Sequence, residues 1–274
     1  MRAFTIRRCR NLLLTAIGCL FAYEAVNAAK IAFFKHQFFS GWLLLSIVAF
    51  LALYNLRKRF VTIPLGSNAT WLQLHIYVGL TSVFVFFLHL DWEFPKGYLE
   101  VSLACLFILV ASSGALGIYL SRRLPKFLTR RGEEVIFERI PYYIGELKRE
   151  AETLVLEAAE LAESTTLPDH YRIHLGFFFS KPRHFFSHLL LSRRPLYGIL
   201  TKLESIERYL NPDELEASRK LRLIVEKKDE LDFHFALQYA LKAWLFIHIP
   251  TTFVMLLLTV LHLVVAYSFS KPLG

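Results

Sequence analysis

Long apolar stretches dominate the hydropathy pattern of this 274-residue chain. Five of them hold at most one charged residue each and match the roughly 20 apolar residues that a helix needs to cross a bilayer. They cover residues 11–28, 39–56, 71–90, 101–120 and 243–269. The pattern therefore predicts an all-α fold, a polytopic membrane bundle of five helical spans.

The first of these stretches allows two interpretations. It follows a run of arginines and ends in Ala-Val-Asn-Ala-Ala, as a cleavable signal peptide does. Its apolar run continues to Phe34, which favours an uncleaved span. Under both interpretations the chain starts in the cytoplasm.

Residues 122–242, between the fourth and fifth stretches, carry too much charge to lie in the bilayer. An Ala-, Leu- and Glu-rich helix is expected early in this insert, followed by a second helix over 195–209. Asn211 caps a third helix, with Pro212 at its first position, and no breaker separates it from the fifth span. We expect three parts: spans one to four in 1–121, a cytoplasmic helical insert in 122–242, and the fifth span with a short external tail in 243–274.

The formal charge of +9 comes largely from basic residues beside the spans, so it does not imply a nucleic-acid partner. Lysines and arginines cluster before span one, after span two and after span four, whereas the opposite ends hold few. The positive-inside rule then places the N-terminus in the cytoplasm and the C-terminus in the periplasm, across a bacterial inner membrane. Spans three and five therefore run in the same direction.

Two histidines in each of spans three and five repeat one spacing. His75 and His89 are fourteen residues apart, and so are His248 and His262. Fourteen residues rise about 21 Å along a helix and return to within about 40° of the same face. Because the spans are parallel, His75 meets His248 at the inner level and His89 meets His262 at the outer level. Paired imidazoles in a charge-free bundle suit the axial positions of haem iron, so the spacing predicts two b-type haems.

Small and basic residues near these histidines extend the prediction. Small residues would make room for the macrocycle, although they also serve ordinary helix packing. Cations at the inner face would bind the haem propionates, and Asp91 is a candidate acceptor for an imidazole N–H. The glycines are Gly79, Gly114 and Gly117, and the cations are Arg57, Arg122 and Arg123.

The insert carries two further histidine pairs, His170 with His174 and His184 with His188. A His-x-x-x-His pattern on a helix can bind a metal ion. Aromatic and basic residues surround both pairs, without a nearby cysteine or a placed carboxylate, which favours a segment lying on the membrane surface. Metal binding stays the alternative.

The three cysteines are scattered and form neither a CxxC nor a CxxCH pattern. This spacing excludes an iron–sulfur cluster, a covalently attached haem and a disulfide framework within this subunit. The cysteines are Cys9, Cys19 and Cys105.

Histidine pairs with thirteen intervening residues on the third and fifth spans resemble the transmembrane domain of ferric reductases and NADPH oxidases and, more widely, bis-histidine dihaem cytochromes b. The resemblance covers 71–120, including the glycine-containing fourth span at Ser113–Leu120, and 243–269. It implies that His75, His89, His248 and His262 are axial haem ligands. The chain departs from that group in its long insert and in lacking a Gly-rich dinucleotide fingerprint, so a flavin and nicotinamide domain is not expected.

These features predict transmembrane electron transfer through two haem b groups, as the cytochrome b subunit of a larger redox complex. The expected partners are a quinone or a cytoplasmic iron–sulfur or flavoprotein subunit, and a periplasmic c-type cytochrome. One alternative is a cytochrome that oxidises quinol or reduces quinone in its own right. Another is a metal or proton transporter, which the sequence disfavours because spans three to five hold no carboxylate and ligands about 21 Å apart cannot share one ion.

Overall fold

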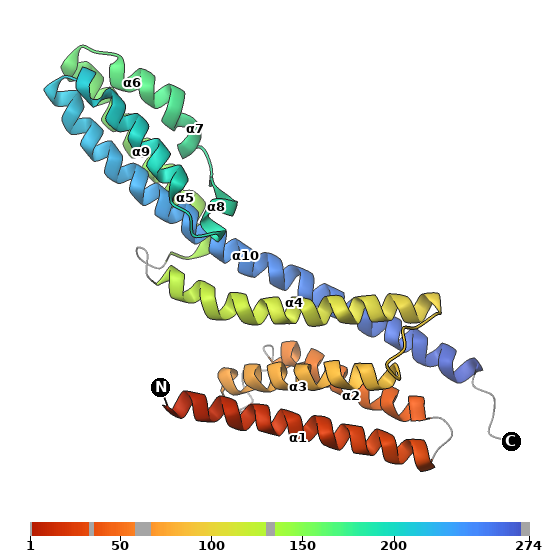
Figure 1. The fold of residues 1–274 in the computed structure, drawn as a ribbon. Coiled ribbons are helices and arrows are strands. Elements are labelled where there is room, and N and C mark those ends of the chain that lie inside the picture. Colours follow the sequence, from red (N-terminus) through yellow and green to blue (C-terminus); the bar gives the residue numbers. More distant parts are fainter. Residues whose placement is uncertain (1, 33–35, 58–66, 130–134, 270–274) are drawn as a thin grey trace. The chain divides into compact units, whose positions relative to one another are not determined.

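The computed structural model describes residues 2–32, 36–57, 67–129 and 135–269, and every element in these ranges is helical (Figure 1). Four long helices come first: α1 (Arg2–Ala32), α2 (His36–Arg57), α3 (Asn68–His89) and α4 (Tyr98–Leu128). Shorter elements follow: η1 (Phe137–Arg139), α5 (Ile140–Ala162), α6 (Thr166–His170), η2 (Tyr171–Leu175), α7 (Gly176–Phe179), α8 (Phe185–Leu189), α9 (Arg194–Ile206) and η3 (Glu207–Tyr209). The chain continues as one 58-residue helix, α10 (Pro212–Phe269).

The chain divides into two compact units. The first comprises Met1–Ile118 and Leu245–Gly274 and is called here the histidine unit; the second, Tyr119–Trp244, is called the insert unit. Helices α4 and α10 each contribute to both units. The unit boundaries lie a few residues from the divisions expected at 121 and 243, and the cytoplasmic location of the insert stays a prediction.

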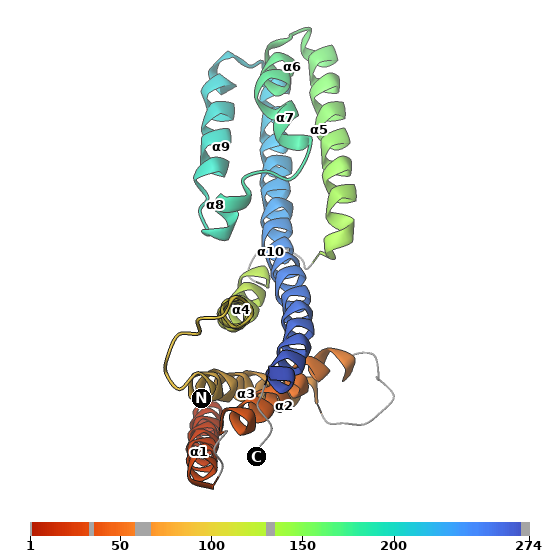
Figure 2. The same cartoon turned by 90° about the vertical axis from the view of Figure 1, so that its right-hand side faces the viewer.

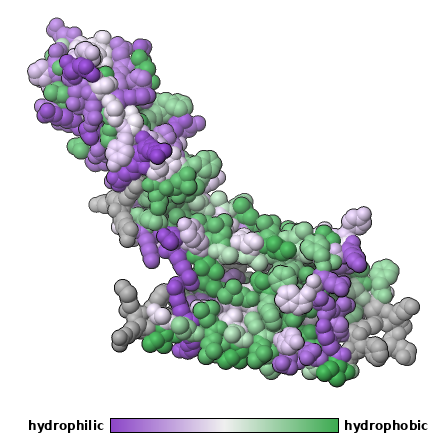
Figure 3. All heavy atoms as spheres, in the orientation of Figure 1, coloured by the Kyte–Doolittle hydropathy of each residue, from purple (hydrophilic) through white to green (hydrophobic). Residues whose placement is uncertain are grey.

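Among the described residues, five helices are long and apolar enough to cross a membrane: α1, α2, α3, α4 and α10. They coincide with the five predicted apolar stretches and are compatible with an integral membrane protein. Many apolar side chains of these helices face outward, among them Phe21 on α1 and Leu257 on α10. Figure 3 shows hydrophobic side chains over much of the histidine unit's surface, as contact with lipid requires.

The core of the histidine unit draws residues from four helices. Val48 of α2, Phe86 of α3, Ala104 and Phe107 of α4, and Met255 of α10 form one buried cluster. The rings of Phe86 and Phe107 stack with centroids 4.1 Å apart. Helix α1 packs against α2 and α3. These contacts hold α3 and α10 in one bundle, with their histidines at fixed heights.

The insert unit is a helical bundle with its own core. In Figures 1 and 2 its helices α5 and α9 run beside the first half of α10, and buried side chains from all three meet in one cluster. Helix α10 begins as expected: Glu214 accepts hydrogen bonds from the backbone N–H groups of Asn211 and Leu167, at 3.3 Å and 3.2 Å. The bond from Asn211 satisfies a donor at the start of α10, as a capping box does, and the bond from Leu167 ties the start of α6 to it.

The aromatic segment of the insert buries some of its side chains and exposes others. Tyr171, Leu175, Phe178 and Phe179 are buried in the core cluster of the insert unit, where the bundle itself provides an apolar environment. Phe186 and Leu190 are exposed, and for such side chains the prediction of an interfacial segment stays a prediction. Phe177 remains exposed, and the guanidinium of Arg183 covers its ring.

Candidate functional site

The four span histidines lie in the histidine unit as two pairs. His75 and His89 are on α3, and His248 and His262 are on α10. The ring of His75 lies within electrostatic range of His248, and the ring of His89 within range of His262. All four side chains are partly buried. The structure thus brings together the same residues that the fourteen-residue spacing pairs.

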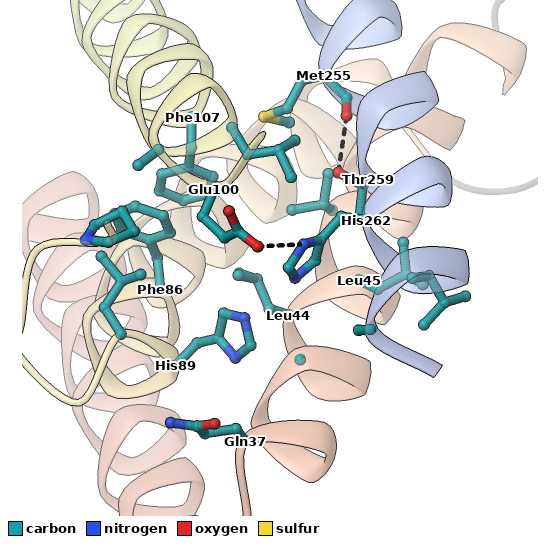
Figure 4. Close-up of a pocket in the computed structure, with 18 of the residues that line it drawn as sticks. Gln37, Leu44, Leu45, Phe86, His89, Glu100, Phe107, Met255, Thr259 and His262 are labelled. Atoms are coloured by element: carbon teal, nitrogen blue, oxygen red, sulfur yellow. Dashed lines mark hydrogen bonds and ion pairs between the residues drawn. The ribbon is translucent and has the colours of Figure 1, made fainter. Parts of the chain in front are cut away.

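A cavity of about 540 Å³ separates the helices around the His89–His262 pair (Figure 4). Both histidines line it, together with apolar side chains that include Phe86, Phe107 and Met255. Its volume falls within the range of about 300–1,000 Å³ that is usual for sites that hold small molecules and cofactors. Apolar walls with two imidazoles suit a flat, largely apolar ligand that carries a metal ion.

Helix α2 supports the ring of His89 through two consecutive residues. The hydroxyl oxygen of Ser40 lies 3.1 Å from Nδ1 of His89 and donates to the carbonyl of Gln37 at 3.1 Å. Gly41 follows, and a Cβ at this position would lie 3.1 Å from Cε1 of the same ring. The imidazole is therefore packed directly on the α2 backbone.

Helix α4 supports His248 in the same manner. The hydroxyl oxygen of Ser113 lies 2.7 Å from Nδ1 of His248 and donates to the carbonyl of Val110 at 2.8 Å. A Cβ on Gly114 would lie 3.7 Å from Cε1 of this ring. Two histidines, one from each pair, thus have equivalent surroundings.

The other two histidines are held differently. The ring of His75 lies 5.0 Å from that of Tyr54, centroid to centroid, and interacts with the backbone of Leu51. Nδ1 of His262 lies 3.8 Å from a carboxylate oxygen of Glu100, which also lines the cavity (Figure 4). Glu100 is in the first turn of α4. Spans three to five, as bounded from the sequence, hold no carboxylate; Glu100 lies one residue before span four and joins the site because α4 begins three residues earlier than the apolar stretch.

The glycines and arginines expected around the haems do not all lie beside the histidines. Gly114 faces His248, whereas a Cβ on Gly79 would have no atom within 4 Å, and Gly117 is buried on α4. Arg122 and Arg123 are exposed residues of the insert unit. The side chain of Arg57 lies outside the described residues, so the propionate contacts stay a prediction.

Gly41 was not predicted from the sequence, although the repeated Ser-Gly dipeptide was an available signal.

Asp91 does not bond to the His89 ring. It follows α3 with φ 50° and accepts hydrogen bonds from Lys30 at 2.5 Å and from His36 at 2.8 Å. Partial burial opposes ionisation, but these two hydrogen bonds outweigh it and lower the pKa of Asp91 to about 2. The carboxylate therefore ties the end of α3 to α1 and α2, and Ser40 takes the role expected of Asp91.

The insert histidines have their own partners. The rings of His170 and His174 lie 4.8 Å apart, and Nε2 of His188 lies 3.6 Å from the carboxylate of Asp229, which the sequence pattern did not place there. Among the described residues, no group of three or more His, Cys, Asp or Glu side chains is arranged to hold a metal ion. The metal alternative for this segment stays untested.

A buried ion pair lies beside these histidines in the insert unit. Nζ of Lys228 lies 2.5 Å from the carboxylate of Asp232, and neither side chain reaches solvent. Burial raises the pKa of Asp232 to about 7, although Lys228 favours its charged form. Lys228 also donates to the carbonyl of Lys181 at 3.0 Å. The pair therefore fastens the segment before α8 to α10.

Comparison with known proteins identifies no family for this chain. No family model matches it, and the searches of curated proteins and of solved structures found no match. The resemblance to the transmembrane domain of ferric reductases and NADPH oxidases stays a prediction from the histidine pattern.

Proposed function

We propose that this chain is a transmembrane cytochrome b that holds two b-type haems and carries electrons across the bilayer. The observation that supports this most strongly is that the four histidines of α3 and α10 form two pairs. His75 pairs with His248, and His89 pairs with His262. The porphyrin supplies four ligands to haem iron, so each haem needs only two imidazoles from the protein.

The surroundings of the His89–His262 pair fit such a group. The cavity between these histidines has apolar walls suited to a macrocycle. Lys96 and Gln37 also line it and would offer donors to propionates there. The hydroxyl of Ser40 lies within hydrogen-bond distance of Nδ1 of His89, the kind of contact that orients metal-binding histidines.

The His75–His248 pair would hold the second haem. Ser113 orients His248, and Gly114 leaves room beside its ring. The sites are about 21 Å apart along the helices, so two one-electron carriers would divide a hydrocarbon core of about 30 Å into short steps. The helices supply what such carriers need from a protein: ligands, burial and hydrogen bonds that set the potentials.

The proposed setting is the bacterial inner membrane, with the N-terminus and the insert in the cytoplasm. The distribution of Lys and Arg around the spans supports this orientation. A quinone, or a cytoplasmic iron–sulfur or flavoprotein subunit, would exchange electrons at one end, and a periplasmic c-type cytochrome at the other. A metal or proton transporter is a weaker proposal, because the two histidine pairs lie too far apart to share one ion.

Electron transfer across sealed liposomes tests the proposal. The purified chain is reconstituted with ferricyanide inside, dithionite is added outside, and loss of internal ferricyanide absorbance is followed. The internal ferricyanide absorbance should fall many times faster in vesicles with the wild-type chain than in empty vesicles. With His89→Ala it should fall no faster than in empty vesicles. As a matched control, replacing the insert histidines together should leave the rate unchanged; they are His170, His174, His184 and His188. A wild-type rate equal to that of empty vesicles contradicts the proposal.

A further inference from the structure

We infer that two Ser-Gly dipeptides, Ser40–Gly41 on α2 and Ser113–Gly114 on α4, are positioning residues that each fix one histidine ligand. The first pair acts on His89 and the second on His248. Each haem site would then contain one imidazole that a serine hydroxyl orients. This inference rests on the proposed function, since it assigns roles at the same two sites.

The hydroxyl hydrogen bonds determine which ring nitrogen carries the proton. A serine hydroxyl has one hydrogen to donate and lone pairs that accept. Ser40 donates that hydrogen to the carbonyl of Gln37, and Ser113 donates its hydrogen to the carbonyl of Val110. Each hydroxyl oxygen therefore acts as an acceptor toward Nδ1 of its histidine, and this nitrogen must carry the hydrogen.

The resulting tautomer is the one that a metal site requires. With the hydrogen on Nδ1, the ring's lone pair is on Nε2, the nitrogen farther from the backbone. In this tautomer His89 and His248 can bind iron through Nε2. The hydrogen bond at Nδ1 also opposes rotation of each imidazole about its Cβ–Cγ bond. An acceptor on Nδ1 also raises the basicity of the ligand.

The glycine of each dipeptide allows the ring to approach the helix. At Gly41 a Cβ would lie 3.1 Å from Cε1 of His89, closer than most such contacts, whereas at Gly114 the corresponding distance to His248 is 3.7 Å, an ordinary contact. An added methyl group should therefore displace His89 and should disturb His248 little. If Gly41 is needed only because helix packing favours small residues, an added methyl group should act alike at both positions. A stronger effect at Gly41 would indicate that its role is to make room for the ring of His89.

The partner ring of each pair has no serine beside it. The ring of His75 interacts with the backbone of Leu51 and packs on Tyr54, and Nδ1 of His262 has Glu100 at 3.8 Å, beyond hydrogen-bond distance. The serine contact is therefore made by one histidine of each pair.

A serine that bonds to a backbone carbonyl is common in helices, so the test needs a serine that does only that. Ser82 on α3 is buried and donates to the carbonyl of Gly79 at 2.7 Å, three residues back, as Ser40 and Ser113 do to theirs. Ser82→Ala therefore removes the same local bond without removing an acceptor from a histidine.

The experiment uses the full chain with its bound haems, and it measures haem content, the midpoints of a redox titration and the low-spin EPR signals of the oxidised form. Ser40→Ala should raise one of the two midpoints and shift one EPR signal, the one that His89→Ala removes. Ser113→Ala should do the same to the other haem. Ser→Thr at either position, which keeps the hydroxyl, should restore the wild-type values, and Ser82→Ala should change neither.

The glycines provide the second arm. Gly41→Ala should lower occupancy of the haem bound by His89, while the control Gly18→Ala, whose added Cβ has nothing within 4 Å, should retain both haems. Two haems in the wild type with no selective effect of either serine overturn the inference and leave the proposed function standing. Absence of haem from the wild type overturns both.

Discussion

Replacing Glu100 by Gln should raise the potential of one haem and leave the other nearly unchanged. The substitution removes a negative charge 3.8 Å from Nδ1 of His262 and keeps the size of the side chain. A carboxylate beside a ligand stabilises the oxidised, more positive iron, so its removal favours reduction. Glu100→Asp keeps the charge and is the matched control.

The magnitude follows from the position of the carboxylate. An iron bound through the far nitrogen of His262 would lie roughly 6–8 Å from this charge, which at an effective dielectric of about 20 corresponds to roughly 2–3 kcal/mol. The Glu100 side chain is 40% exposed, so solvent screening reduces this to about 1 kcal/mol. For a one-electron couple that is a rise of about 40 mV.

Spectroelectrochemical titration of the purified chain measures this shift. Both midpoints are recorded at pH 7 for wild type, Glu100→Gln and Glu100→Asp, and the affected haem is identified as the one absent from His262→Ala. The other haem, about 21 Å away along the helices, should move much less. An unchanged midpoint, a downward shift, or an equal shift of both haems would refute the reasoning.

Three further outcomes are expected. Asp91→Asn should lower the stability of the histidine unit by about 1 kcal/mol at neutral pH, because Lys30 and His36 stabilise the ionised carboxyl. Since the folded pKa of Asp91 is lowered to about 2, this contribution is complete above the ordinary carboxyl pKa and is lost as pH falls to about 2, so melting curves of variant and wild type should converge there. Lys228→Met should destabilise the insert unit by roughly 3–5 kcal/mol, because it leaves Asp232 buried without its cation. The double variant Lys228→Met/Asp232→Leu should recover most of this stability in thermal unfolding followed by circular dichroism. No recovery would contradict the pairing. Dithionite or a quinol should reduce the purified chain, whereas rapid reduction by NADH alone would contradict the absence of a dinucleotide site.

The spans and the insert helices could be predicted because their signals are local. Apolar length identifies the five long helices, and the Asn211–Pro212 start fixes where α10 begins. The pairing of His75 with His248 follows from equal spacing on two helices. These inferences need no knowledge of how the helices pack.

The side-chain contacts between helices could not be predicted from the sequence. The Ser-Gly dipeptide of α2 does not reveal which histidine Ser40 meets, because the rotation of one helix against another is set by packing contacts such as those of Phe86 and Phe107. The aromatic residues around Phe178 were misplaced because a protein core and a bilayer select the same composition. Glu100 was not anticipated, because hydropathy places a helix end at the last apolar residue and not at the last hydrogen bond.

The haem content of the purified chain tests the central claim most directly. A pyridine haemochrome measurement should give about two b-type haems per wild-type chain. It should give about one when a single histidine of either pair is replaced, with His75→Ala and His248→Ala losing the same haem and His89→Ala and His262→Ala losing the other. A wild-type chain without haem, expressed with an adequate haem supply, would contradict the account.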